Sequence, residues 1–144
     1  TKIVADYISE ITGADQFEIV THKYDGMAYT PLTHLAQEEA HKDERPPFEG
    51  EPTNLDQYDT IFIGGPIWWG TYPQVMFTFF DAYDLNGKTI CPFATHEGSG
   101  LANTVSDIRR AYPNANLQKG FSIYGHEVRT NKAKVEKWIQ SLDI

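Results

Sequence analysis

Residues 60–73 read Thr60-Ile-Phe-Ile-Gly-Gly-Pro-Ile-Trp-Trp-Gly-Thr-Tyr-Pro73 and indicate the architecture of the whole chain. The apolar residues from Ile61 to Ile63 follow one another without alternation, which is typical of a strand that is covered on both faces. The Gly, Pro and Trp residues that come next predict a loop. Strands of this kind belong to parallel sheets whose two faces are covered by helices.

Helices and strands alternate along the rest of the chain. Short apolar or β-rich runs predict strands at residues 17–20, 60–64, 89–94 and 117–124. Helical periodicity and capping residues predict helices at residues 2–12, 30–45, 74–83, 101–112 and 131–142. This strict alternation predicts an α/β fold of three layers with a mostly parallel sheet, in one domain over residues 1–144. The order begins with a helix, although a βαβ fold would be expected to begin with a strand.

The composition excludes several classes of protein. The chain has 144 residues, of which 40% are hydrophobic and 13% aromatic, so it can bury an ordinary core. No apolar run approaches the ~20 residues of a membrane span, and no signal-type segment opens the sequence, so we expect a cytoplasmic protein with no membrane partner. The net charge of −8 argues against a nucleic-acid partner, because phosphate binding requires a cationic face. Solubility and docking to basic partners explain this charge equally well.

Two loops are expected to carry the chemistry, because ligands of open parallel sheets bind beyond the carboxyl ends of the strands. The first loop contains Pro66, Ile67, Trp68, Trp69 and Gly70. The flat face of a Trp in such a loop suits stacking on a planar heteroaromatic ring, and the glycine lets backbone amides approach closely. The competing interpretation is that the two Trp side chains only plug the loop or an oligomer interface, and residue types leave both open.

The second loop follows the predicted strand at 89–94. It comprises Thr95, His96, Glu97, Gly98, Ser99 and Gly100. Its glycines and the free amides of the helix predicted to follow could hold a carbonyl or an anionic edge of a ligand. The prediction of a binding loop is strengthened by its expected position, one strand away from the Trp-containing loop at the same edge of the sheet.

Three stretches together resemble the short-chain bacterial flavodoxin-like family: residues 58–73, Leu85-Asn-Gly-Lys-Thr-Ile90 and residues 95–100. The resemblance covers nearly the whole chain. It implies a noncovalent FMN whose isoalloxazine ring lies between residues 66–70 and 95–100. Trp68 or Trp69 would stack on the ring, and backbone groups around residues 98–100 would contact its pyrimidine edge. A carboxylate at Glu97 facing the ring would disfavour the anionic reduced flavin, but His96 and Glu97 pointing to solvent is an equally open interpretation.

The sequence departs from the family at its first residues. Family members begin with a strand and a Ser/Thr-Gly-Asn-Thr type loop that binds the FMN phosphate, and Thr1 corresponds to the last residue of that loop. The strand is central in the family's 2-1-3-4-5 order, so we expect a gap between residues 17–20 and 60–64. Two remedies stay open: residues that precede Thr1 in the natural protein, or strands that close up or pair across a homodimer. We favour the first.

The resemblance implies a redox protein that transfers electrons from FMN to partner proteins or to a small quinone-like acceptor. Because the phosphate loop is absent from these residues, FMN is expected to bind them weakly or not at all. No catalytic side chain is expected, since the flavin carries the chemistry. The alternative is a flavodoxin-fold protein without cofactor that serves as a binding or interaction module.

Two weaker signals have simpler interpretations. His34, Glu38 and His41 share one face of a predicted helix at a spacing that could bind a metal ion. With no further ligand in view, a solvated helix face is the preferred interpretation. Cys91 lies in a predicted strand without an adjacent cationic group, so we expect a core residue rather than a reactive thiol.

Overall fold

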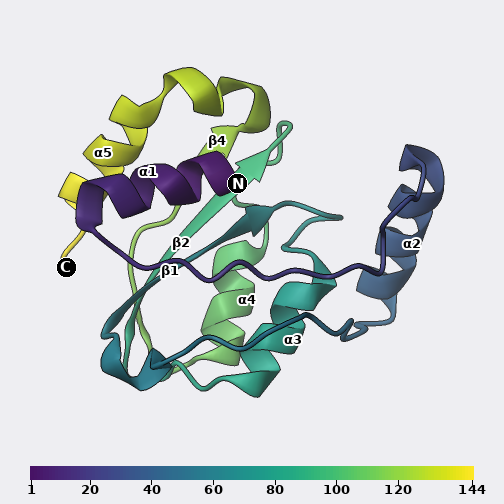
Figure 1. The fold of residues 1–144 in the computed structure, drawn as a ribbon, viewed down its shortest axis with the longest axis horizontal. Helices are drawn as coiled ribbons and strands as arrows, with labels where there is room; N and C mark the ends of the chain where they lie inside the picture. Colours follow the sequence, from purple (N-terminus) through teal and green to yellow (C-terminus); the bar gives the residue numbers. More distant parts are fainter.

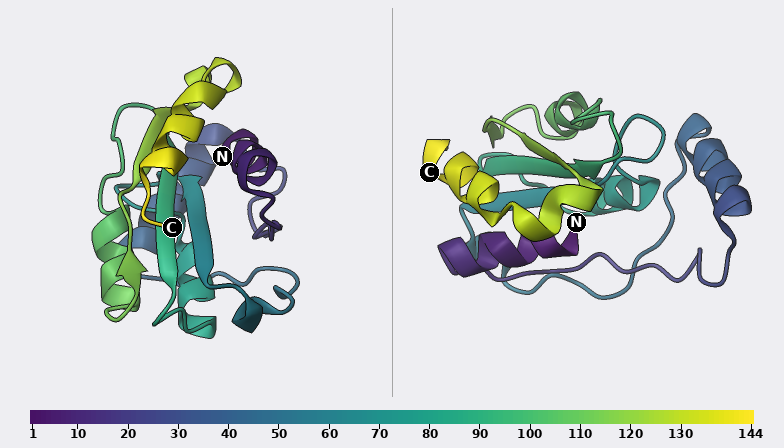
Figure 2. Two further views of the ribbon diagram at one scale, coloured as in Figure 1. Left: turned by 90° about the vertical axis from the view of Figure 1, so that its left-hand side faces the viewer. Right: turned by 90° about the horizontal axis from the view of Figure 1, so that it is seen from above.

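Two layers of helices enclose a parallel sheet in the computed structural model, which describes residues 1–144 (Figure 1). The helices are α1 (Lys2–Thr12), α2 (Tyr29–His41), α3 (Gln74–Ala82), α4 (Thr104–Ala111) and α5 (Lys132–Ser141), with short 3-10 turns at Leu55–Gln57 and Gly125–Thr130. Helices α1 and α5 cover one face of the sheet and α3 and α4 the other, while α2 stands apart from these layers (Figure 2). The predicted three-layer α/β fold is confirmed.

The sheet has four strands, β1 (Thr60–Pro66), β2 (Thr89–His96), β3 (Asn116–Leu117) and β4 (Phe121–Tyr124). All pairings are parallel and run through β2, with β1 on one side and the two short strands on the other. The predicted strand at 117–124 is therefore two strands. The ladder is interrupted at Lys119, whose carbonyl accepts a hydrogen bond from Trp138 Nε1 at 2.8 Å.

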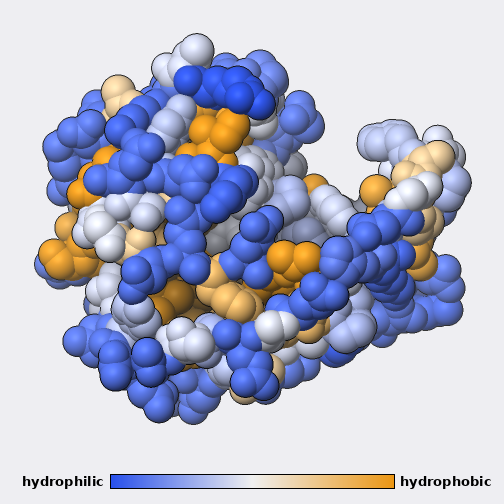
Figure 3. Space-filling model, viewed as in Figure 1, coloured by the Kyte–Doolittle hydropathy of each residue, from blue (hydrophilic) through white to orange (hydrophobic).

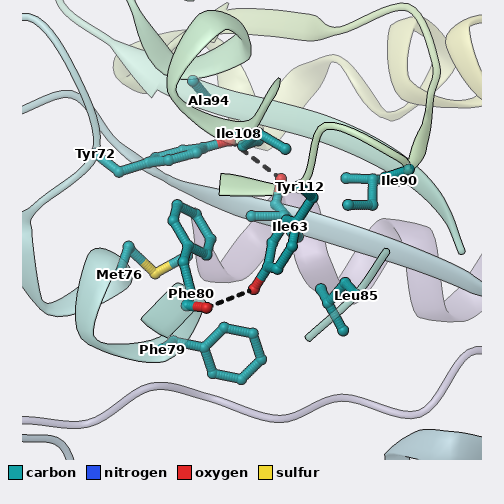
Figure 4. Close-up of a cluster of buried hydrophobic side chains, with 11 residues drawn as sticks. Ile63, Tyr72, Met76, Phe79, Phe80, Leu85, Ile90, Ala94, Ile108 and Tyr112 are labelled. Atoms are coloured by element: carbon teal, nitrogen blue, oxygen red, sulfur yellow. Dashed lines mark hydrogen bonds between the residues drawn. The ribbon is translucent and has the colours of Figure 1, made fainter. Parts of the chain in front are cut away.

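A cluster of buried side chains joins β1 and β2 to α3 and α4 (Figure 4). Tyr72 and Tyr112 are almost fully buried within it. The Tyr72 hydroxyl donates to the Phe93 carbonyl at 2.7 Å, and the Tyr112 hydroxyl donates to the Tyr83 carbonyl at 2.6 Å. Burial raises the pKa of both phenols above the ordinary value, so both stay neutral donors. These bonds fix the approach of α3 and α4 to the sheet.

The prediction of a strand at residues 17–20 is wrong. This segment runs in an extended course but forms only one isolated antiparallel bridge, from Val20 to Glu49. A strand requires a neighbour for its backbone groups, and the nearest candidate, β1, lies across a groove of about 570 Å³ that residues 14–19 and β1 line together.

The groove is the gap that the sequence led us to expect, and the strands have not closed up over it. Helix α1 lines one of its sides with Ala5 and Ile8, and α3 lines another with Val75, Met76 and Phe79. Apolar surface shows in a hollow on the face of the molecule that residues 13–21 cross (Figure 3). The edge of β1 that faces the groove has no strand partner.

Two helices are shorter than the patterns predicted. Helix α2 ends at His41 rather than at residue 45, because Asp43 takes a left-handed conformation with φ of 51°. Helix α4 begins at Thr104 rather than at residue 101, because Ala102 takes a left-handed turn with φ of 47°. None of the helices combines the length and the apolar character needed to cross a bilayer.

Candidate functional site

The two loops singled out from the sequence lie side by side. In the parallel register of β1 and β2, Pro66 pairs with Thr95, so both strands end at the same level of the sheet. Residues 66–70 and 95–100 therefore lie at one edge of the sheet, as predicted, but both strands run two residues further than predicted, so Pro66 belongs to β1 and Thr95 and His96 belong to β2. We call these segments the Trp loop and the 95–100 loop.

Hydrogen bonds hold the Trp loop in one conformation. Trp68 N donates to the Thr71 carbonyl at 2.7 Å, which closes a tight turn with Trp69 and Gly70 in positive-φ conformations. The Gly70 carbonyl accepts from Asn103 N at 2.9 Å, and the Thr71 hydroxyl donates to an Asp107 carboxylate oxygen at 2.5 Å. These bonds tie the Trp loop to residues 103 and 107, which follow the 95–100 loop in the chain.

The two Trp side chains have different surroundings. Trp68 is half-buried, and its ring meets the Tyr24 ring edge-to-face, with the centroids 5.4 Å apart. Trp69 is 48% exposed, and its Nε1 donates to the Thr33 carbonyl of α2 at 3.0 Å. An exposed ring whose polar atom is already satisfied presents a flat apolar face to a ligand.

The 95–100 loop is held by its own side chains. Gly98 N donates to His96 Nδ1 at 2.9 Å, and the His96 ring packs on Tyr124 with the centroids 4.5 Å apart. Gly98 and Gly100 both have positive φ angles, which a side chain would disfavour. Ser99 is exposed. The free amides of helix α4 do not border this loop directly, because that helix starts only at Thr104.

Glu97 lies at the surface, with a carboxylate oxygen close to Gly125. Its side chain is 81% exposed, and His126 Nδ1 lies 3.9 Å from a carboxylate oxygen. His96, in contrast, is anchored by the Gly98 amide and the Tyr124 ring. His96 and Glu97 are the two polar side chains that the sequence placed near the flavin ring. His96 is held by a hydrogen bond and a ring contact, whereas the Glu97 side chain is mostly in solvent.

Thr1 joins the same edge of the sheet. Its hydroxyl lies 2.7 Å from the hydroxyl of Thr95, at the start of the 95–100 loop. No side chain caps the N-terminus of α1, so the first amides of this helix are open to an anion. The structure thus brings together all three predicted parts of the site, namely Thr1, the Trp loop and the 95–100 loop.

Sequence reasoning missed the residues that hold these loops. Tyr24, Thr33, Asn103 and Tyr124 each contact one of the two loops or their continuation. Tyr24 and Thr33 lie more than 30 residues from the Trp loop, Tyr24 outside every predicted helix and strand and Thr33 in the helix predicted at residues 30–45. No local pattern could have indicated these contacts, because they depend on how α2 is placed against the sheet.

The remaining candidates from the sequence, the helix face with Glu38 and the thiol of Cys91, lie in ordinary structural environments. Glu38 forms an ion pair with Lys42 at 2.6 Å on the surface of α2, and no group of His, Cys, Asp or Glu side chains forms a metal site. Cys91 is fully buried in β2, which confirms the prediction of a core residue, and burial raises the pKa of its thiol to about 11.

Comparisons with known proteins agree with the fold. A candidate flavoprotein from Bacteroides eggerthii is 27% identical, with a TM-score of 0.81, and the match covers 100% of this chain and 91% of that one. One from Bacteroides uniformis is 30% identical, with a TM-score of 0.84 and coverage of 98% and 90%. A flavoprotein from Lactobacillus acidophilus, solved in complex with FMN, is 21% identical with a TM-score of 0.68, covers 96% and 89%, and shows the shared fold.

A search of the curated proteins gave no match. The family model described as flavodoxin, however, matches residues 1–142, which is almost the whole chain. On this match, the chain belongs to the flavodoxin family.

Proposed function

We propose that this protein binds FMN and transfers electrons. The observation that carries the proposal is the pairing of Pro66 with Thr95, which places a loop with an exposed Trp next to a glycine-containing loop at one sheet edge. Such an edge is where open parallel sheets bind their ligands. The FMN complex of the Lactobacillus acidophilus flavoprotein, which shares the fold, supports the choice of cofactor.

The residues present fit the ring of FMN. Trp69 offers a half-exposed indole face, and the neighbouring 95–100 loop offers the backbone groups of Ser99 and Gly100, whereas the Gly98 amide already donates to His96. When bound, FMN supplies the redox chemistry, while the side chains of this chain bind and orient it. Trp69 is the better candidate for stacking, because the ring of Trp68 is already engaged by Tyr24.

The residues present fit the phosphate less completely. The uncapped N-terminus of α1 and the Thr1 hydroxyl offer donors to an anion next to Thr95. A single helix end contributes only about 0.3–1 kcal/mol to anion binding at an exposed site. We therefore expect residues 1–144 to bind FMN weakly, with most of the affinity from the ring.

Glu97 tunes the flavin by its charge in this proposal. A carboxylate beside the ring disfavours the anionic reduced form and lowers the reduction potential. Because the Glu97 side chain is 81% exposed, solvent screens its charge and the expected effect is small. His96 is fixed against Tyr124, so it acts on the shape of the loop rather than as a mobile acid.

The electron acceptors proposed are a redox protein or a small quinone-like molecule, in the cytoplasm. The net charge of −8 favours a partner with a basic docking face. A nucleic-acid partner is not proposed, for the same electrostatic reason. A homodimer joined along the edge of β1 stays a prediction.

Substitutions of Trp69 test the proposal. Replacement with leucine removes the stacking face, and we expect FMN affinity to fall by about tenfold or more, the scale of an aromatic–heterocycle stack. Trp69→Phe keeps a flat ring but loses the hydrogen bond to Thr33, so it should retain most of the affinity. Quenching of flavin fluorescence measures both. Equal affinities for the wild type and Trp69→Leu would contradict the proposal.

The second candidate function is a binding module without cofactor. The open groove beside β1 favours it, because an unpaired strand edge accepts another extended chain. Absence of any flavin fluorescence change on titration with FMN or riboflavin would favour this module over the redox protein.

A further inference from the structure

Helix α2 carries one buried charge that the proposed function does not use. Glu39 is only 1% exposed, although most of the helix faces solvent. A buried carboxylate is costly unless it is paired and hydrogen-bonded. Glu39 satisfies this requirement: its oxygens accept from the Tyr24 hydroxyl at 2.7 and 2.9 Å and from Lys23 Nζ at 2.9 Å.

The partner of Glu39 reaches the Trp loop. The edge contact of the Tyr24 ring with Trp68 has an interplanar angle of 76°, which is the favoured geometry of a T-shaped pair. A chain of three side chains, Glu39, Tyr24 and Trp68, thus connects α2 to the Trp loop. A second link from the same helix runs from the Thr33 carbonyl to Trp69 Nε1, so α2 is connected to Trp69 directly and to Trp68 through Tyr24.

We propose that Glu39 is a positioning residue for the Trp loop, which acts through Tyr24 to fix the orientation of Trp68. Its effect on flavin binding rests on the proposed function, whereas its effect on Trp68 does not. The charge matters because both carboxylate oxygens accept the phenol hydrogen bond while one also faces the Lys23 ammonium. A glutamine carries no charge to pair with the Lys23 ammonium, and its amide NH2 would replace one of the two oxygens that now accept from the Tyr24 hydroxyl.

The first experiment uses no flavin. NMR signals of the indole N–H groups are compared between the wild type and Glu39→Gln, after Trp68→Phe has identified the Trp68 signal. We expect the Trp68 signal to shift or broaden, while the signal of Trp138, which is buried in the core between the sheet and helices α1 and α5, keeps its position. The matched control is Glu38→Gln, which removes an exposed ion pair one residue away and should leave Trp68 unchanged.

A double-mutant cycle then tests the route through Tyr24. Tyr24→Leu removes both the hydroxyl and the ring, and we expect it to shift the Trp68 signal as Glu39→Gln does. In the Tyr24→Leu background, Glu39→Gln should cause no further shift of that signal. Independent, additive shifts would overturn the proposed route. Loss of stability in either variant without a change at Trp68 would reduce Glu39 to a structural residue and overturn the proposal.

Flavin binding is the last readout. Glu39→Gln should weaken FMN binding by about threefold to tenfold, because loss of the Tyr24 contact at Trp68 would displace the loop that also carries Trp69, and Glu38→Gln should not weaken it. If the wild type bound no FMN, the proposed function would fail while the Trp68 measurements still decided the role of Glu39. If Glu39→Gln fails to fold, Tyr24→Phe supplies the test, because it removes the hydrogen bond to Glu39 and retains the ring. An unchanged Trp68 signal in folded Tyr24→Phe would overturn the proposal.

Discussion

At the scale of single residues, Cys91 illustrates how burial controls reactivity. Its side chain is fully buried in β2, and burial raises the pKa of its thiol to about 11. Because the thiolate is the nucleophile, the folded protein should not react with an aromatic disulfide reagent at about pH 8. One equivalent of thiol should react after unfolding in urea. Rapid reaction of the native protein, measured by release of the coloured thiol, would contradict this burial.

His22 gives a dependence on pH with a definite sign. Its Nδ1 lies 2.7 Å from an Asp25 oxygen and its Nε2 lies 3.3 Å from a Glu49 oxygen. The hydrogen bond to Asp25, followed by the charge of Glu49, raises the pKa of His22 above its ordinary value of 6.5. The stabilisation by protonated His22 is therefore fully present below about pH 6.5 and is lost as pH rises through the raised pKa.

An NMR titration of the imidazole measures this shift. Glu49→Gln should bring the pKa of His22 back toward 6.5, because it removes one of the two carboxylates. A pKa at or below 6.5 in the wild type would show that the contacts between residues 20–25 and Glu49 do not form in solution.

At the scale of elements, the close packing of β1 on β2 predicts a sensitive glycine. A Cβ added at Gly64 would lie 2.0 Å from an atom of the Phe93 ring, so the strand or the ring must move. We expect Gly64→Ala to destabilise the protein by about 1–3 kcal/mol or more, measured by urea unfolding. At Gly125 the only close approach of the added Cβ is to a carboxylate oxygen of the exposed Glu97 side chain at 2.8 Å, and the His96 carbonyl lies at an ordinary 3.9 Å, so Gly125→Ala serves as the control. Equal stability of the two variants would contradict the packing of Phe93 on Gly64.

The elements that sequence reasoning predicted well are those with a local pattern. The apolar run at 60–64 and the stripe of α1, with Val4 and Ile8 buried, follow from periodicity alone. The segment at 17–20 has the composition of a strand, but a strand also requires a neighbour, and the groove leaves it without one. The places of the two loops were predictable because loops follow strands; the tethers from Tyr24 and Thr33 were not, because they join distant segments.

At the scale of the whole molecule, the groove beside β1 leaves backbone groups without hydrogen-bonded strand partners. Its apolar sides come from α1 and α3, and the edge of β1 offers unpaired backbone groups. An engineered chain with an apolar strand and a hydroxyl-rich loop placed ahead of Thr1 should therefore be more stable and should bind FMN more tightly. Urea unfolding and flavin titration measure the two effects.

The control for this extension carries prolines in the added strand, which cannot pair with β1. It should give no gain in stability. If both extensions changed the stability equally, the added strand would not bind in the groove, and the edge of β1 would have another partner.

The most direct measurement compares FMN with riboflavin, which has the same ring and no phosphate. If residues 1–144 hold the ring between the Trp loop and the 95–100 loop, with only the end of α1 for the phosphate, both flavins should bind weakly. Their dissociation constants should then differ by about fivefold or less, and Trp69→Leu should weaken both equally. Tight, stoichiometric binding of FMN alone, or binding that Trp69→Leu leaves unchanged, would contradict this view of the site.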